Sequence, residues 1–406
     1  MYTEWKRISF LVCISVICFC LHCDSLTKSS RPEFEESNLL QLDSQDSADS
    51  VRPADFTTHV FREFAAGLPS RTDLVKKERV AHDHIHEVMF AIQQKNVARL
   101  TRLLHQISDP DSKNYGNHRT RIEIEEVTSN PESRNFLLQF LHDAGATTTS
   151  ESIFGEYISA QAPVSLWEKM FNTQFYKFHH ISENSDDVVE LVRAEMYSVP
   201  TALHEHVASV FQTVQMSQKK WGPPVVFRSK NSTSIIQNHV EMVGILDPQK
   251  LNRYYGIENY IGSSSSSQAA IQSLNQFVSP VDLTSFQDAY RLPRQNVTKF
   301  VGGFNNDYIC TIFPETCAEG NLNMQYLMSI GQGTPTMNLY TDLDYFSGWL
   351  LAVANLVNPP LVVSISYGAS EASITASEFD AFNLQAIKLG LMGVTILASS
   401  GGQSSP

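Results

Sequence analysis

Between residues 279 and 398, short apolar runs rich in β-branched residues alternate with longer segments whose apolar residues have helical spacing. The expected strands are 299–304, 336–340, 361–366 and 394–398, and the expected helices are 279–290, 319–330, 346–356 and 377–391. This alternation predicts that residues 241–406 form half of an open, mostly parallel sheet with helices on its faces. Sites in such sheets gather at the carboxyl ends of strands, so 366–368 and 399–403 are candidate site loops.

Residues 81–217 have a different order of elements. Here we expect strands at 86–93, 153–162, 174–180 and 188–199, and helices at 96–107, 131–144, 165–171 and 201–214. Strands and helices mixed in this way favour a split βαβ sandwich of the α+β class. Residues 25–80 are polar and acidic with little periodicity, which predicts a flexible segment. A polar linker, 218–240, separates the two folded regions, and exposed linkers of this kind are where processing proteases cut.

The N-terminus indicates entry into the secretory pathway. Lys6 and Arg7 precede an apolar stretch, 8–21, that is short for a membrane span, so residues 1–24 are expected to be a cleaved signal peptide. A retained signal anchor is the alternative. The net charge of −13 argues against nucleic acid and anionic membrane surfaces as partners.

Modification of the chain after translocation can also be anticipated. Four of the six cysteines lie in or beside the signal segment, which leaves Cys310 and Cys317 for the mature chain. In an oxidising lumen they could close a small disulfide loop, with two free thiols as the alternative. Asn231 and Asn296 lie in N-x-S/T sequons and are candidate glycosylation sites.

Glu319 and Asn323 lie four residues apart in the expected helix 319–330. This spacing brings both side chains onto one helix face. Two carboxyl groups in such a position could share a proton and carry out acid–base chemistry, whereas an amide does not titrate. Glu315 and Glu319 have the same spacing, but Pro314 favours a loop at Glu315.

Several segments in order resemble the sedolisin family of serine-carboxyl peptidases, most closely its tripeptidyl-peptidase members. In residues 81–217, QQKNVARL (93–100) and SDPDSKNYG (108–116) are similar to the family's activation domain. In residues 241–406, the similar segments are DPQKLNRYYGI (247–257), NLNMQYLM (321–328), VVSISYG (362–368) and VTILASSGG (394–402). The resemblance implies a ferredoxin-like propeptide domain followed by part of a subtilisin-like α/β catalytic domain.

The resemblance also assigns roles to positions. Glu319 stands where the family has its general base, Asn323 where it has the aspartate that shares a proton with that base, and Gly402 where it has an oxyanion aspartate. The family's nucleophilic serine lies in a Gly-Thr-Ser motif, which does not occur in these 406 residues. The family's calcium site is expected beyond the C-terminus. We therefore expect no cofactor and no metal in this chain, and a C-terminally truncated catalytic domain.

By resemblance the chain would be the zymogen of an acid-active peptidase that removes tripeptides from protein N-termini. It would be lysosomal or extracellular and would cut itself within 237–245. Because three catalytic groups are absent, we expect no activity from this chain alone. One alternative is a fragment of an active peptidase. Another is a secreted binding protein whose propeptide-type domain inhibits an active sedolisin. Peptides, proteins or such a relative are then the expected partners.

Overall fold

A computed structural model provides the structure of the chain. It describes residues 55–66, 68, 71, 74–181, 188–216, 247–258, 260–303, 305–341, 346–368 and 371–399. The expected signal peptide, the linker 218–240, Asn231 and Gly402 lie outside these residues. Among the helices of the described ranges, none combines the length and the apolar composition needed to cross a bilayer.

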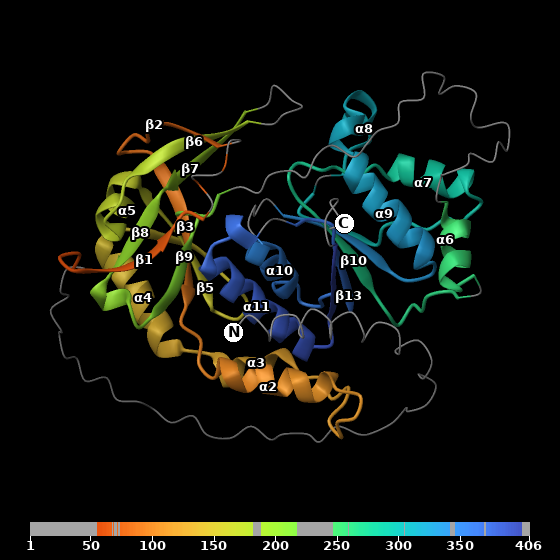
Figure 1. Ribbon diagram of the computed structural model, residues 1–406, viewed down its shortest axis with the longest axis horizontal. Coiled ribbons are helices and arrows are strands. Elements are labelled where there is room, and N and C mark those ends of the chain that lie inside the picture. The colour runs from red at the N-terminus through yellow and green to blue at the C-terminus, as the bar shows by residue number, and fades with distance from the viewer. Residues whose placement is uncertain are drawn as a thin grey trace, which may run out of the picture. The chain divides into compact units, whose positions relative to one another are not determined.

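Residues 247–399, here called the C-terminal module, are built on a five-stranded sheet in which every strand pair is parallel (Figure 1). Its strands are β10 (Gln268–Gln272), β11 (Lys299–Val301), β12 (Thr336–Tyr340), β13 (Val362–Ile365) and β14 (Thr395–Ala398), in the order β11-β12-β10-β13-β14. From β10 the chain crosses to the edge strand β11, returns to β12 beside β10, and then continues on the other side of β10 through β13 and β14. The direction of the connections thus reverses between β10 and β13. Ligands of α/β sheets bind at the carboxyl ends of the strands at a switch point of this kind.

Helices cover both faces of this sheet. They are α6 (Pro248–Tyr255), α7 (Pro280–Ala289), α8 (Asp307–Ile312), α9 (Ala318–Ile330), α10 (Phe346–Ala354) and α11 (Ala376–Leu391), with short 3-10 turns η3 (Pro314–Thr316) and η4 (Glu371–Ser373). Ala270 of β10 packs with Leu283 of α7 and Met324 of α9, whereas its neighbour Ile271 packs with Trp349 of α10. Successive residues of a strand point to opposite faces, so the two helix pairs lie on opposite sides of the sheet.

Residues 55–216, here called the N-terminal module, combine antiparallel strands with helices. The strands are β1 (His59–Phe64), β2 (Leu74–Arg79), β3 (Ile85–Ile92), β4 (Thr147–Glu151), β5 (Tyr157–Pro163), β6 (Phe175–Ile181), β7 (Val188–Ala194), β8 (Met196–Pro200) and β9 (Val207–Phe211). The helices are α2 (Val97–Ser108), α3 (Arg121–Thr128), α4 (Pro131–Ala144) and α5 (Val164–Phe171), with the 3-10 turn η2 (Thr201–Leu203). The strands form three sheets, β4-β5-β3-β9, β2-β6-β7 and β1-β8. The whole is thus a mixed α/β structure with a parallel sheet in its second half.

The two modules share apolar cores. Met89 and Phe211 of the N-terminal module pack with Leu351 of α10 and Ala381 of α11. A second core joins residues of α2 and α3 to Leu391 at the end of α11. The outer face of the α10–α11 layer is therefore covered by the N-terminal module.

Three sequence predictions in the N-terminal module are wrong. Residues 201–214 are not a helix, because Val207, Val210 and Phe211 are buried in strand β9, which pairs with β3. The expected strand 188–199 is two strands, since β7 pairs with β6 and β8 with β1. The end of the expected flexible segment 25–80 contains β1 and β2. In all three places the structure is decided by pairing with strands that are distant in the sequence. Local sequence patterns contain no information about such pairing.

The expected start of the helix 279–290 is confirmed. Ser279 is the N-cap of α7, where its hydroxyl accepts a hydrogen bond of 2.9 Å from the backbone N–H of Asp282. Pro280 is the first helical residue. A capping side chain satisfies one of the free N–H groups of the first turn, and this signal is local, so it can be recognised in the sequence.

Candidate functional site

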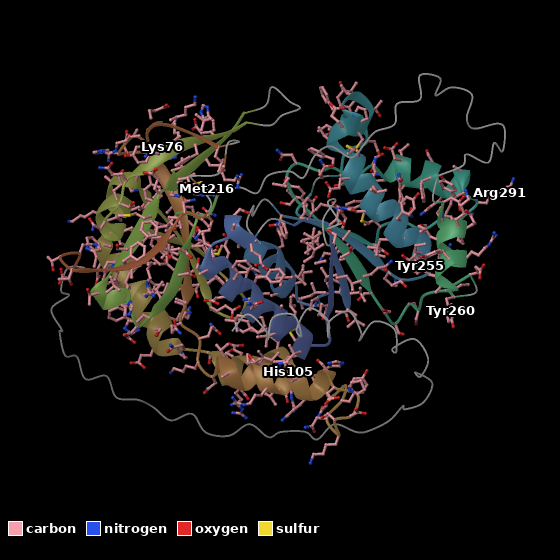
Figure 2. All side chains as sticks on the ribbon, viewed as in Figure 1. Lys76, His105, Met216, Tyr255, Tyr260 and Arg291 are labelled. Carbon is pink, nitrogen blue, oxygen red and sulfur yellow. A yellow bond between two sulfur atoms is a disulfide. The ribbon has the colours of Figure 1, made fainter. Side chains whose placement is uncertain are left out.

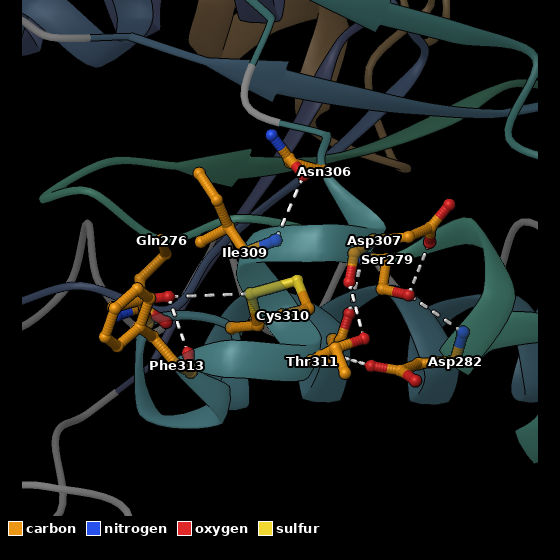
Figure 3. Close-up of a disulfide and its surroundings, with 12 residues drawn as sticks. Gln276, Ser279, Asp282, Asn306, Asp307, Ile309, Cys310, Thr311 and Phe313 are labelled. Atoms are coloured by element: carbon orange, nitrogen blue, oxygen red, sulfur yellow. Dashed lines mark hydrogen bonds between the residues drawn. A yellow bond between two sulfur atoms is a disulfide. The ribbon is translucent and has the colours of Figure 1, made fainter.

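Helix α9, which bears Glu319 and Asn323, begins directly after a disulfide (Figure 3). Cys310 in α8 and Cys317 are joined, with their Cα atoms 5.4 Å apart. Asn306 caps α8 by accepting a hydrogen bond of 3.0 Å from the N–H of Ile309. The disulfide thus closes α8 and η3 into a short loop that fixes where α9 starts.

The first turn of α9 lies against the segment that follows β10. The N–H of Glu319 donates to Oε1 of Gln276 at 3.2 Å, and the N–H of Phe277 donates to the carbonyl of Thr316 at 2.9 Å. At Gly320 a Cβ atom would lie 2.3 Å from the carbonyl oxygen of Phe277. Only glycine permits this approach, which brings Glu319 to the end of the central strand.

Asn321 joins α9 to α7. Its Oδ1 accepts from the N–H of Ser279 at 2.8 Å, and its Nδ2 donates to a carboxylate oxygen of Asp282 at 2.8 Å. Ser279 and Asp282 form the capped first turn of α7, so these hydrogen bonds fix the position of α9 relative to α7. Asn321 was not singled out from the sequence, although it belongs to the NLNMQYLM segment.

The site residues predicted from the sequence, Glu319 and Asn323, both lie on α9, one helical turn apart, and both are partly exposed. The Nδ2 group of Asn323 donates a hydrogen bond to Oε1 of Gln272, the last residue of β10, at 3.2 Å. The amide of Asn323 is therefore anchored to the sheet. Glu315, the alternative first member of a pair, lies in η3 rather than on α9 and is exposed.

Tyr367 follows β13 and connects it to the end of β10. Its hydroxyl accepts a hydrogen bond of 3.1 Å from the N–H of Ser273. The hydroxyl proton can be donated to the carbonyl oxygen of Ser273 at 3.3 Å or to Oε1 of Gln272 at 3.4 Å. The ring of Trp349 packs against the Tyr367 ring, with 5.3 Å between their centroids. Gln272 thus receives a hydrogen bond from Asn323 and lies within hydrogen-bond distance of the Tyr367 hydroxyl. Gln272 was not among the predicted site residues, because the sequence pattern does not indicate strand β10.

Burial, followed by the negative charge of Glu319, raises the pKa of Tyr367 above its ordinary value. The phenol therefore stays neutral and keeps its proton for donation. Among Glu319, Asn323, Gln272 and Tyr367, only Glu319 bears a carboxylate. Amides and a neutral phenol can orient a carboxylate by hydrogen bonds, but they cannot share its proton as a second carboxyl group does.

Other residues predicted from the sequence lie apart from this network. Asn296 is exposed in the loop before β11, where a glycan would have space. Ser399, at the start of the second candidate loop, is exposed, and its N–H donates to the carbonyl of Ile365 at 3.0 Å.

Three histidines, His82, His84 and His86, alternate along the chain near the beginning of β3. The strand begins only at Ile85, and His86 is buried with its Nε2 2.9 Å from the carbonyl of Gln212. Within the described ranges, no three His, Cys, Asp or Glu side chains are grouped so that they could hold a metal ion.

Comparisons with known proteins agree with this organisation. Residues 72–216 match the family described as Pro-kumamolisin, activation domain. Physarolisin of Physarum polycephalum is 27% identical over 351 residues, which cover 83% of this chain and 57% of physarolisin. Tripeptidyl-peptidase 1 of Homo sapiens is 24% identical over 324 residues (77% of this chain, 55% of the relative), and that of Dictyostelium discoideum 25% over 353 residues (78% and 56%). The chain thus spans little more than half the length of these relatives.

Proposed function

We propose that this chain, which belongs to the sedolisin family of peptidases and is similar to tripeptidyl-peptidase 1, is a homologue of an acid-active, serine-type tripeptidyl-peptidase. In this homologue the catalytic carboxyl pair lacks its second member, because Asn323 stands in its place. The observation that carries this proposal is the hydrogen bond from Asn323 to Gln272. It keeps an amide at the place where the family has its proton-sharing aspartate.

The two modules correspond to the parts of a zymogen. Residues 81–217 would be a ferredoxin-like activation domain, which the match over 72–216 supports, and 218–240 the linker where processing occurs. Residues 241–406 would form the first half of a subtilisin-like catalytic domain. The parallel sheet with β10 at a switch point is consistent with that assignment.

In this proposal Glu319 occupies the position of the general base. The amide of Asn323 is still anchored by its hydrogen bond to Gln272, but it has no carboxyl proton to share with Glu319 at low pH. In the serine-protease triad, replacing the orienting aspartate by asparagine lowers turnover by roughly 10⁴-fold. Loss of an oxyanion group, here at Gly402, lowers turnover by roughly a further 10²–10³-fold.

The 406 residues contain no Gly-Thr-Ser segment to supply the family's nucleophile. Without a nucleophile no acyl-enzyme forms, whatever the state of Glu319. We therefore infer that these 406 residues, by themselves, have no peptidase activity.

The proposal is tested by incubating the purified chain, cut in the linker 218–240, with a tripeptide-releasing chromogenic substrate between pH 3.5 and 6. An active tripeptidyl-peptidase at the same concentration is the positive control. We expect release at the buffer rate throughout. Release above that rate which disappears in a Glu319→Gln variant would contradict the proposal.

Entry into the secretory pathway is part of the same proposal. The disulfide between Cys310 and Cys317 is typical of an oxidising compartment, and Asn296 is exposed enough to accept a glycan. A lysosomal or extracellular location would follow. Glycosidase treatment of protein from secreting cells should reduce its mass. In an Asn296→Gln variant this decrease in mass should be smaller by the mass of the glycan on Asn296.

A second candidate function is inhibition of an active sedolisin by the N-terminal module. It is favoured by the apolar contacts that the N-terminal module makes with α10 and α11. A relative whose helices resemble α10 and α11 would present a similar apolar surface to this module. Addition of the linker-cut chain should then inhibit an active tripeptidyl-peptidase. Unchanged activity at micromolar concentrations of the chain would exclude this function.

A further inference from the structure

Helix α11 of the C-terminal module inserts a lysine into the N-terminal module. Lys388 is only 1% exposed, although lysine is rarely buried. Its Nζ forms an ion pair with Oε2 of Glu156 and donates a hydrogen bond of 2.9 Å to Oε1 of Gln94. Nζ also lies 5.1 Å from the centroid of the Phe154 ring, within the range of a cation–π interaction.

The carboxylate that receives Lys388 is itself fixed. Glu156 is 3% exposed, and its other oxygen, Oε1, accepts a hydrogen bond of 2.6 Å from Gln385, one turn before Lys388 on α11. The backbone of Glu156 is held by bonds to Ile92 and to the hydroxyl of Ser152, at 2.8 and 3.1 Å. Both charged groups are therefore buried, and each is hydrogen-bonded to a neutral amide as well as to the other.

A buried ion pair of this kind contributes little net stability, because desolvation offsets the attraction between the charges. Removing one partner is nevertheless costly, because the other charge stays buried alone. The shared apolar cores around Ala381 and Leu391 supply contact area without regard to charge. The pair can therefore decide which helix the N-terminal module accepts, as charges do in other specific interfaces.

We propose that Glu156, Gln94 and Phe154 form a lysine socket, through which the N-terminal module recognises a peptidase-type helix by a lysine at the position of Lys388. Two features favour lysine over arginine. The compact ammonium group matches one carboxylate oxygen and one amide oxygen, and a wider guanidinium group would have more N–H donors to satisfy in the same buried place. The socket goes beyond the proposed function, because recognition of α11 requires no peptidase activity.

The experiment uses the full chain with a specific protease site placed in the linker 218–240. After cutting at pH 7, the dissociation constant of the two pieces is measured by dilution with a fluorescent label on one piece. The variants are Lys388→Met, Lys388→Arg, Glu156→Gln and the double variant Lys388→Met with Glu156→Met. Lys76→Met is the control, since Lys76 forms an exposed ion pair with Glu195. Figure 2 shows Lys76 at the outer edge of the N-terminal module.

We expect each single substitution in the socket to weaken association at least 100-fold, the double variant to recover most of that loss, and Lys76→Met to have no effect. Association of Lys388→Arg as tight as wild type would overturn recognition of lysine. A double variant no better than the single ones would overturn the socket itself. If a single variant does not fold, recovery of folding in the double variant supports the proposal and failure to recover rejects it. Peptidase assays on the same samples test the proposed function separately.

Discussion

Asn323 differs from aspartate by one side-chain atom, an amide nitrogen in place of a carboxylate oxygen. That atom donates to Gln272, so the substitution fits the hydrogen bonding of the site while it removes the titrating group. Tyr367 also forms hydrogen bonds at this site without titrating, because burial and the negative charge of Glu319 raise its pKa and keep its phenol neutral. Asn323 and Tyr367 thus supply hydrogen bonds at the end of β10, but neither can take the part of a second carboxyl group.

His86 makes the N-terminal module sensitive to acid. Burial, followed by the positive charge of Arg193, lowers its pKa from 6.5 to about 4. A lowered pKa in the folded state stabilises the fold above pH 6.5, and this contribution is lost as pH falls toward 4. The loss amounts to roughly 3 kcal/mol at most. We expect His86→Gln to reduce the fall in melting temperature between pH 7 and pH 4.5.

The control for His86 is His82→Gln, since His82 lies in the same segment but is exposed. This variant should show the same pH dependence as wild type. An equal fall in melting temperature for wild type and His86→Gln would contradict the assignment of the acid sensitivity to His86. Arg193 and His84 are the charged groups that act on His86, so both are kept unchanged in these comparisons.

At the scale of elements, the position of α9 depends on the absence of a side chain at Gly320. A Cβ there would meet the carbonyl oxygen of Phe277 at 2.3 Å, so Gly320→Ala must shift the helix. We expect it to lower the free energy of unfolding by roughly 1–3 kcal/mol, measured by urea titration. Gly368→Ala is the control because nothing lies within 4 Å of its Cβ position. Equal stability of the two variants would show that α9 is not held this closely.

The disulfide before α9 is a second element-scale constraint. Cys310 and Cys317 are seven residues apart, and closing so short a loop should stabilise the fold by roughly 2–3 kcal/mol. Because both cysteines are buried, replacement of both by alanine is the suitable variant. We expect a lower melting temperature and faster amide hydrogen exchange at the start of α9. Unchanged exchange there would mean that contacts with α7 and β10 hold the helix without the disulfide.

An element could be predicted from the sequence when the contacts that stabilise it are local in the chain. The caps and apolar spacing of α4, α7 and α11 are local, so their approximate bounds could be read from the sequence. Strand β9 resembled a helix because its buried residues are explained only by pairing with β3, more than a hundred residues away. Strand β10 escaped recognition because its central Ala269 and Ala270 have little strand preference of their own.

At the scale of the whole molecule, the site joins residues that are far apart in the sequence. Gln272, Asn323 and Tyr367 meet because β13 pairs with β10 while α9 covers the same end of the sheet. Sequence spacing could place Glu319 and Asn323 on one helix face, but it could not show what lies opposite them. The lysine socket has the same character, since it joins Gln94, Glu156 and Lys388 across two modules.

The two modules are joined through their apolar cores and through charge. Residues from α2, α3 and β9 pack with α10 and α11, and Glu63 of β1 accepts hydrogen bonds of 2.9 and 2.7 Å from the N–H and hydroxyl of Ser377 in the first turn of α11. Burial raises the pKa of Glu63, although the hydrogen bonds from Ser377 act in the opposite direction. Protonation of Glu63 as pH falls therefore removes part of the desolvation cost of burying this carboxylate, an effect on stability opposite in sign to that of His86. The hydrogen bonds from Ser377 favour the charged carboxylate, so they weaken when Glu63 takes up a proton.

We propose that Glu319 occupies the position of the family's general base and that the amide of Asn323 replaces the family's proton-sharing aspartate. Carbon-detected NMR of the carboxyl groups tests this assignment in wild type, in Asn323→Asp and in Val357→Asp, which adds a carboxylate at an exposed position outside helix α9. We expect Glu319 to titrate in a single step in wild type and in Val357→Asp. In Asn323→Asp, Glu319 and the introduced carboxyl group should titrate in two coupled steps, one of them raised well above an ordinary carboxyl pKa. Two independent steps at ordinary pKa values in Asn323→Asp would contradict the claim, as would coupled titration of Glu319 in wild type.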